Sequence, residues 1–153
     1  MSNTALIDNL NIALSQELAG AIQYMQHSFL VTGPEREVYR SFFRAQSQEA
    51  HDHAVMLGDK IVSLGGVPTV EPAMIRQSTE LSEMLRQDLT LEREALVGYM
   101  AAWESCGDEH KPTQFILEER IAEEQLHVEE LEKLTSERQS IITSEKITLR
   151  QVG

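Results

Sequence analysis

The sequence predicts an all-α protein, built as a bundle of four long helices with one long crossover between the second and the third. Helix-favouring residues such as Leu, Ala, Glu and Gln dominate the composition. Apolar residues recur at spacings of three and four along four long segments, and no stretch alternates as a β-strand does. The eight glycines and four prolines fall mainly between these segments.

The first predicted helix runs from about residue 4 to residue 31, with an apolar face that begins at Leu6 and continues to Phe29. It ends at TGPE, where Gly33 can take a left-handed conformation and Pro34 can open the next helix. The second predicted helix runs from about residue 35 to residue 64 and ends at GGVP.

An extended connection containing VPTVEPAM follows, and the third predicted helix runs from about residue 78 to residue 106. The fourth starts near Pro112, after GDEHKP, and continues to about Ser140. Helices of about 27 residues would each span roughly 40 Å. Two tight turns and one connection of about 14 residues suit a bundle with a single crossover. We therefore expect one domain over residues 1–140 and a tail, 141–153, that forms a short extra element or is disordered.

The charge balance favours cations as partners. The chain has 25 acidic against 13 basic residues, a formal net charge of −12. This disfavours binding to nucleic acid or to an anionic membrane surface. The single cysteine, Cys106, cannot form an internal disulfide. No apolar run approaches 18 residues and the N-terminus lacks the features of a signal peptide, so we expect no membrane span and a cytoplasmic location.

An internal repeat relates the two halves of the chain. ELAGAIQYM (17–25) matches EREALVGYM (92–100), so that Glu17 precedes Tyr24 by seven residues and Glu92 precedes Tyr99 by seven. Seven residues are two helical turns, so each glutamate shares a helix face with its tyrosine. The first two helices therefore look like a copy of the last two.

A second acid stands 32 residues after each of these glutamates: Glu49 in the first half and Glu124 in the second, each followed by a histidine. Glu124 and His127 are at i and i+3, on one helix face. A Glu-x-x-His from each of two helices and one Glu from each of the other two form the ligand set of a di-iron carboxylate bundle. Carboxylates are hard oxygen donors, and imidazole adds a neutral nitrogen. The pattern therefore predicts a di-metal site with six ligands: Glu17, Glu49, His53, Glu92, Glu124 and His127.

The stretches SQELAGAIQYMQH (15–27), DKIVSLGGVP (59–68), MLRQDLTLE (84–92) and EEQLHVEELE (123–132) resemble bacterioferritin, within the ferritin-like superfamily, and the resemblance covers about residues 5–135. It implies an iron storage and detoxification protein with a ferroxidase site, which oxidises Fe(II) to Fe(III) with O2 or H2O2. It also implies a homo-oligomeric shell of 12 or 24 subunits; the tail lacks a convincing fifth helix, which weakens the case for 24. Tyr24 and Tyr99 are expected to hydrogen-bond metal ligands.

The family pattern is broken in the second helix. Counting back three residues from His53 reaches Ala50, which cannot bind metal, and the acid is Glu49. Either one bridging carboxylate is missing, or Glu49 binds. A π-bulge, which inserts one residue into a helix, would bring Glu49 into register. An i,i+4 pair also shares a face without any bulge. We hypothesise that Glu49 and His53 both bind metal.

The resemblance also implies that haem can bind at a dimer interface. The family's haem-ligating methionine sits two residues before its metal histidine, and His51 occupies that position here. His51 lies about 200° round the helix from His53, so it points away from the metal site. Imidazole is a good haem ligand. His51 and Met56 are therefore candidate haem ligands, and a solvated or interface histidine is the alternative.

Three alternatives to the ferroxidase stay open. The first is a rubrerythrin-like peroxidase bundle, although that family's electron-transfer domain needs four cysteines. The second is a non-catalytic haem-binding or structural shell subunit whose metal site is broken at Ala50. The third is a DNA-protecting mini-ferritin; it is disfavoured because the tail has only Lys146 and Arg150 as bases, and because such proteins usually place the site between subunits.

Overall fold

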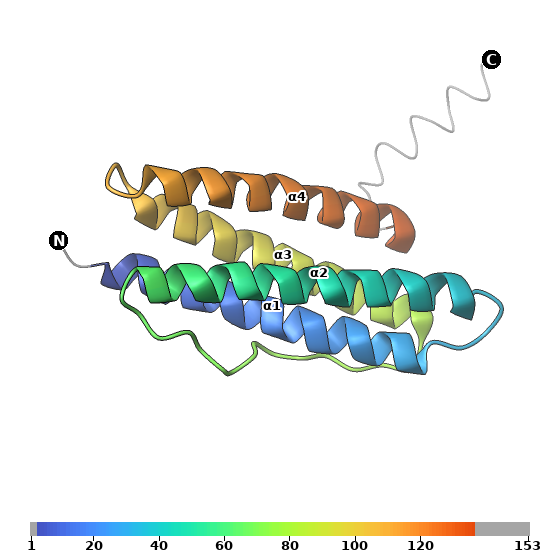
Figure 1. Ribbon diagram of the computed structural model, residues 1–153. Helices are drawn as coiled ribbons and strands as arrows, with labels where there is room; N and C mark the ends of the chain where they lie inside the picture. Colours follow the sequence, from blue (N-terminus) through green and yellow to red (C-terminus); the bar gives the residue numbers. More distant parts are fainter. Residues whose placement is uncertain (1–2, 137–153) are drawn as a thin grey trace, which may run out of the picture.

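The computed structural model describes residues 3–136 of the chain, which form four helices and no strand (Figure 1). The predicted all-α four-helix bundle is confirmed. The helices are α1 (Thr4–Leu30), α2 (Arg36–Ser63), α3 (Leu81–Cys106) and α4 (Lys111–Thr135). The predicted tail, 141–153, lies outside the described residues, so its assignment stays a prediction.

Figure 1 shows that α1 and α4 run in one direction and α2 and α3 in the other. Short turns join α1 to α2 and α3 to α4, which makes each of these pairs an antiparallel hairpin. α1 packs against both α2 and α3, and α3 packs against α4. None of the helices between residues 3 and 136 is both long and apolar enough to cross a membrane. The predicted cytoplasmic location stays a prediction.

The connection between α2 and α3, residues 64–80, returns along the whole length of the bundle (Figure 1). It is hydrogen-bonded to α1 on the way. The side chain of Asn11 donates to the carbonyl of Val67 (3.1 Å) and accepts from the amide of Thr69 (2.8 Å), and the amide of Ala73 donates to the carbonyl of Ser15 (2.8 Å). These bonds satisfy backbone groups that lack helical partners, so the crossover is fixed on the bundle.

The ends of the helices mostly follow the turn residues. Gly33 has the predicted left-handed conformation, with φ 97°. The expectation that the fourth helix reaches Ser140 is wrong, because α4 ends at Thr135. Ser136 takes a left-handed conformation (φ 58°) and its amide bonds to the carbonyl of Glu132, a common way for a helix to stop.

The hydrophobic core is split into two clusters along the bundle. One uses α1 between Leu6 and Leu14, together with residues of the other three helices, and the second uses α1 from Ala19 to its end. Glu17 lies between them and is also buried. The bundle therefore has two apolar layers with a polar layer between them, and that polar layer holds the candidate site.

Candidate metal centre

Four buried ionisable side chains, one from each helix, meet in the polar layer. Glu17 (α1), His53 (α2), Glu92 (α3) and Glu124 (α4) are 4%, 6%, 7% and 2% exposed, respectively. Burying an ionised carboxylate without a partner is very costly. Three buried glutamates in one layer therefore need positive charge, from protons or from metal ions.

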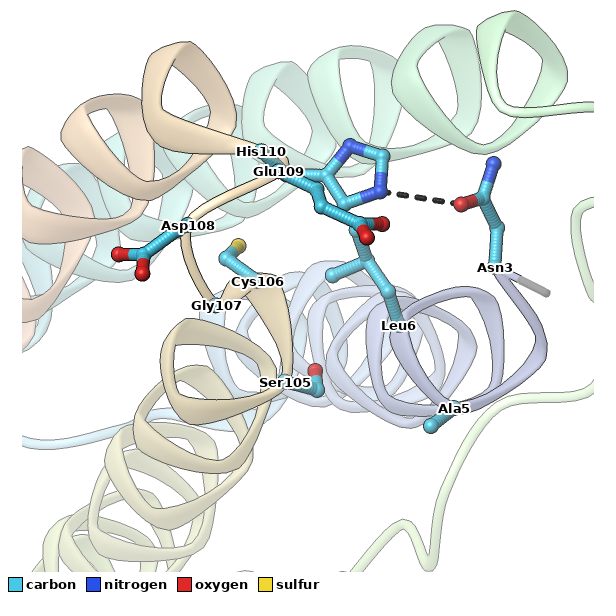
Figure 2. A pocket seen from close by; sticks show the side chains of 9 residues that line it. All are labelled: Asn3, Ala5, Leu6, Ser105, Cys106, Gly107, Asp108, Glu109 and His110. Carbon is cyan, nitrogen blue, oxygen red and sulfur yellow. Dashed lines mark hydrogen bonds between the residues drawn. The ribbon is translucent and has the colours of Figure 1, made fainter. Parts of the chain in front are cut away.

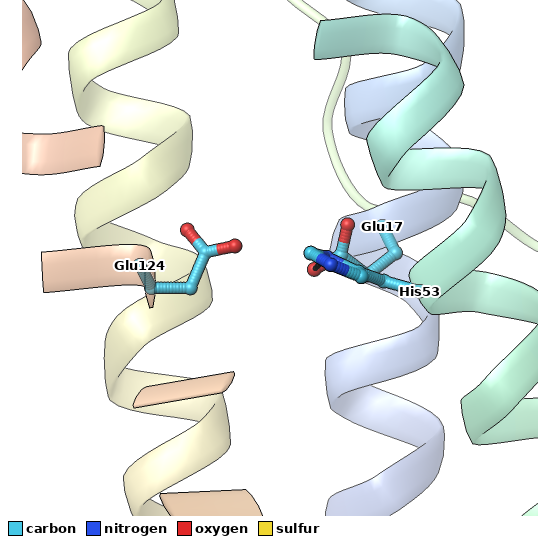
Figure 3. A group of neighbouring side chains, drawn as sticks. All are labelled: Glu17, His53 and Glu124. Carbon is cyan, nitrogen blue, oxygen red and sulfur yellow. Dashed lines mark ion pairs between the residues drawn. The ribbon is translucent and has the colours of Figure 1, made fainter. Parts of the chain in front are cut away.

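The first possible metal position lies between Glu17, His53 and Glu124, which each offer one ligand atom within 4.8 Å of the others. Figure 3 shows Glu124 pointing across the interior of the bundle towards Glu17 and His53. Nδ1 of His53 lies 3.5 Å from a carboxylate oxygen of Glu17. Two oxygens and one nitrogen are a donor set that suits iron and other divalent transition metals.

The second possible position lies between Glu92, Glu124 and His127, again within 4.8 Å. Nδ1 of His127 is 3.8 Å from Oε2 of Glu92 and 3.8 Å from Oε2 of Glu124. Glu124 belongs to both groups, so its carboxylate can bridge two ions. Its Oε2 atom and Nδ1 of His127 are buried without a hydrogen-bond partner. Buried polar atoms are normally paired, and metal coordination would satisfy both, so the residues fit a two-metal site.

Each tyrosine of the internal repeat hydrogen-bonds the glutamate of the other copy. The hydroxyl of Tyr99 donates to Glu17 (2.7 Å), and the hydroxyl of Tyr24 donates to Glu92 (2.8 Å). Burial raises the pKa of both phenols well above its usual value, with neighbouring carboxylates adding to the effect. Each tyrosine therefore stays a proton donor that fixes one glutamate. In Glu92 the other oxygen, Oε2, is the one that lies near Nδ1 of His127.

Glu49 lies on the other side of the histidines. α2 is α-helical throughout, so the π-bulge hypothesis is wrong. The Oε1 atom of Glu49 is 3.4 Å from Nε2 of His127 and 3.9 Å from Nε2 of His53. These are the nitrogens that point away from the two inner positions. Ala50 is buried in the place that the family pattern gives to a bridging carboxylate. The structure thus gathers five of the six predicted ligands around the inner positions and places Glu49 behind the histidines.

Two residues that the sequence analysis did not single out complete the outer side. Arg120 lies with one guanidinium nitrogen 2.8 Å from Nε2 of His53 and 2.8 Å from a carboxylate oxygen of Glu123. Glu123 forms a third group of metal-ligand type with Glu49 and His127. The signal for Arg120 was its spacing, because it precedes Glu124 by four residues and so shares its helix face.

The proton balance of the polar layer follows from its burial. Burial, with the neighbouring carboxylate of Glu92, raises the pKa of Glu124 to about 10. Burial also raises the pKa of Glu17, against the opposing effect of His53. Burial acts to lower the pKa of His127, but the surrounding glutamates outweigh it and raise that pKa to about 12. The metal-free site therefore holds protons, which bound cations would displace.

The described part of the chain also has hollows between its side chains. One, of about 420 Å³, lies at the turn between α3 and α4, where His110 hydrogen-bonds Asn3 (Figure 2). None of the three metal-ligand groups found within residues 3–136 includes a residue that lines it. A smaller cavity of about 40 Å³ lies against Tyr24 and His127, large enough for water beside the metal centre.

The two candidate haem ligands lie in different environments. The side chain of His51 is 65% exposed and lies 3.7 Å from Asp52. Met56 packs against the first hydrophobic cluster. Of the two, His51 is therefore the one that an external group could reach, and haem binding stays a prediction.

Comparison with known proteins agrees with the four-helix fold. Residues 7–140 match the model of the ferritin-like domain. A nutrient stress-induced DNA-binding protein of Synechococcus sp. is 30% identical over 74% of this chain and 70% of its own length. A bacterioferritin of Streptomyces coelicolor is 29% identical over 83% and 77%, respectively.

Two solved structures are similar over most of the chain. A ferritin-like, diiron-carboxylate protein from Bacillus anthracis superposes with a TM-score of 0.84 at 33% identity, covering 88% of this chain and 99% of its own. A dodecameric thioferritin, the bacterioferritin-related protein from Bacteroides fragilis, gives a TM-score of 0.80 at 25% identity, covering 97% and 92%.

Proposed function

The chain belongs to the ferritin-like domain family, and on that premise we propose that it binds two Fe(II) ions inside each bundle, oxidises them with O2 or H2O2, and stores the resulting Fe(III). The observation that carries the proposal is the position of Glu124. It belongs to both inner groups, and one of its oxygens is buried without a partner.

In this proposal iron is the substrate, and each ion receives one histidine nitrogen, one terminal carboxylate and a share of Glu124. Glu17 and His53 hold one ion, and Glu92 and His127 hold the other. Three protein ligands leave positions open for water and for the oxidant. Two adjacent Fe(II) ions supply two electrons together, which is the number that reduces O2 to H2O2 or H2O2 to water.

The remaining groups position the ligands. Tyr24 and Tyr99 fix the glutamates from behind. Glu49 lies where it can accept the N–H of Nε2 from His127, an arrangement that orients a metal-bound imidazole and raises its basicity. The hydrogen bond to His127 holds the pKa of Glu49 at about 2. We therefore assign Glu49 to the histidines' outer side and no longer to a bridge between the ions.

The test is an anaerobic titration of the metal-free protein with Fe(II), followed by O2 or H2O2 and by the absorbance of Fe(III). We expect two irons per chain and rapid oxidation, lost in Glu124→Ala. Glu129→Ala is the matched control, because Glu129 is an exposed acid on the same helix. Oxidation no faster than in buffer would reject the ferroxidase and favour the structural or haem-binding alternative. A strong preference for H2O2 without storage of iron would favour the peroxidase alternative.

We further propose that the protein forms a homo-oligomeric shell and does not bind nucleic acid. A dodecameric neighbour supports the shell, and mass photometry distinguishes 12 from 24 subunits. The name of the Synechococcus relative points to DNA binding by that protein. In this chain, however, a net charge of −12 repels the phosphates of DNA. A mobility shift of duplex DNA at low salt would overturn this second statement.

A further inference from the structure

The two histidines of the candidate site have groups of opposite charge nearest to their outer nitrogens. Nε2 of His53 faces the guanidinium of Arg120 at 2.8 Å, and Nε2 of His127 faces the carboxylate of Glu49 at 3.4 Å. The five inner ligands give no such asymmetry, because each position has one glutamate, one histidine and a share of Glu124.

The contact with Arg120 opposes metal binding at His53 in two ways. A guanidinium has only N–H donors, so Nε2 of His53 must accept, and in a neutral imidazole the ring proton is then on Nδ1. Nδ1 is the nitrogen that faces Glu17 and the inner metal position. A metal ion at Nδ1 would need the proton to leave or to move to Nε2, where it would meet the N–H groups of Arg120. The positive charge of Arg120 also repels a cation bound to the same ring.

The contact with Glu49 favours metal binding at His127. A carboxylate accepts the N–H of Nε2, so an incoming metal ion has to displace only the proton on Nδ1, and the contact increases the basicity of that nitrogen. Nδ1 of His127 is buried and has no hydrogen-bond partner, whereas Nδ1 of His53 lies 3.5 Å from Glu17. The ring of His127 is therefore oriented for an ion.

We propose that Arg120 is a positioning residue that makes the two metal positions unequal, so that the Glu92–Glu124–His127 position fills first and the Glu17–His53–Glu124 position fills only when Arg120 leaves His53. This inference rests on the proposed function, since it concerns the same two ions. It goes beyond it by assigning an order of binding and the residue that sets it.

The structure also provides the place to which Arg120 moves. Its guanidinium is already held by Glu123 at 2.8 Å, so it can leave His53 and keep that ion pair. Oxygens of Glu123 and Glu49 lie 3.7 Å and 3.9 Å from Nε2 of His53. Either carboxylate can then accept the N–H that metal binding places on Nε2. The second ion is therefore bound at the cost of breaking one hydrogen bond and rearranging one side chain.

The experiment is a calorimetric titration of the metal-free protein with Zn(II), which has no redox chemistry. We expect two separate binding steps in the wild type. Arg120→Gln removes the charge and provides an amide that can either donate or accept, so it should tighten the second step by about tenfold or more and leave the first nearly unchanged. Arg120→Lys keeps the charge and should keep the steps unequal. Arg76→Gln is the control, because Arg76 also forms a half-buried pair with a glutamate, Glu94.

Nuclear magnetic resonance of the histidine rings gives a readout that a merely structural role would not change. The first equivalent of Zn(II) should shift the ring resonances of His127 before those of His53, and Arg120→Gln should abolish that order. Two equal binding steps in the wild type, or shifts that begin at His53, would overturn the inference and leave the two-metal site in place. Absence of Zn(II) binding in the wild type and in Arg120→Gln would instead reject the site itself, and the inference with it.

Discussion

Replacing Glu124 with glutamine should make the metal-free protein more stable and its metal binding weaker. The reason is the position of this carboxyl group, which is buried beside Glu92 and Glu17 and has an oxygen without a hydrogen-bond partner. Glutamine has nearly the same shape and no charge. The substitution removes the electrostatic cost together with the bridging ligand.

The magnitude follows from the proton that the folded chain retains. Glu124 has a pKa of about 10 in the folded protein, against 4.5 for an ordinary glutamate. Because the folded-state pKa is the higher one, the stability that Glu124 contributes is greatest below pH 4.5 and falls as the pH rises towards about 10. At neutral pH the loss amounts to about 3 kcal/mol. Glu92 and His127 lose a favourable neighbour in the variant, so we expect a net gain of about 1–3 kcal/mol, or roughly 3–10 °C in melting temperature.

The assay is thermal unfolding between pH 5 and pH 9, with and without Zn(II). The wild type should lose stability with rising pH more steeply than Glu124→Gln in the absence of metal. At a Zn(II) concentration about 100 times the dissociation constant, the wild type should gain about 2.7 kcal/mol, and the variant clearly less. A metal-free variant that melts below the wild type, or that gains as much from Zn(II), would refute the assignment of Glu124 as a buried, bridging carboxylate.

Three further substitutions test the surroundings of the site. Tyr24→Phe leaves Glu92 without its 2.8 Å donor, and should weaken Zn(II) binding by about tenfold in calorimetry; an unchanged affinity would remove the tyrosine from its supporting role. Ala50→Glu adds a carboxylate at a buried position, so it should tighten Zn(II) binding and lower the melting temperature of the metal-free protein. Weaker Zn(II) binding would show that position 50 of α2 does not face the ions. Asp88→Ala leaves the buried ring of His27 without its partner at 3.0 Å, so it should lower the free energy of unfolding in urea by about 2 kcal/mol or more. An unchanged free energy of unfolding would contradict the burial of this pair.

The number, length and order of the helices could be predicted because apolar spacing, glycine and proline act locally along the chain. The internal repeat also singled out Glu17, Glu92 and Glu124, since a glutamate on an apolar helix face is costly unless it is paired or metal-bound, and the structure buries all three in the polar layer. The end of α4 was missed because a serine in a left-handed conformation, Ser136, has no strong sequence signal.

The position of Glu49 could not be predicted from spacing. On a helix, Glu49 and Ala50 flank the direction of His53 by about 40° on one side and 60° on the other. Glu49 and Ala50 therefore both satisfy the rule that residues three or four positions apart share a helix face. Only packing against the other helices decides which flank faces inward, and the structure buries Ala50 and leaves Glu49 half-buried.

Pairs from distant parts of the chain were missed for the same reason. His53 and Arg120 are 67 residues apart, and His27 and Asp88 are 61 apart. No local pattern links either pair. The hydrogen bonds of a histidine also decide which ring nitrogen is free, and that choice is visible only when the partners from all four helices are in place.

The most direct test of the two-metal site is a crystal structure of the protein soaked with Fe(II) under anaerobic conditions, with anomalous scattering recorded at the iron edge. We expect two peaks inside one bundle, about 3.5–4 Å apart, with one oxygen of Glu124 bound to each ion and Nδ1 of both histidines coordinated. A single peak, or a peak on the side of Glu49 and Glu123 at Nε2 of His127, would rule out the two-metal site proposed for this bundle.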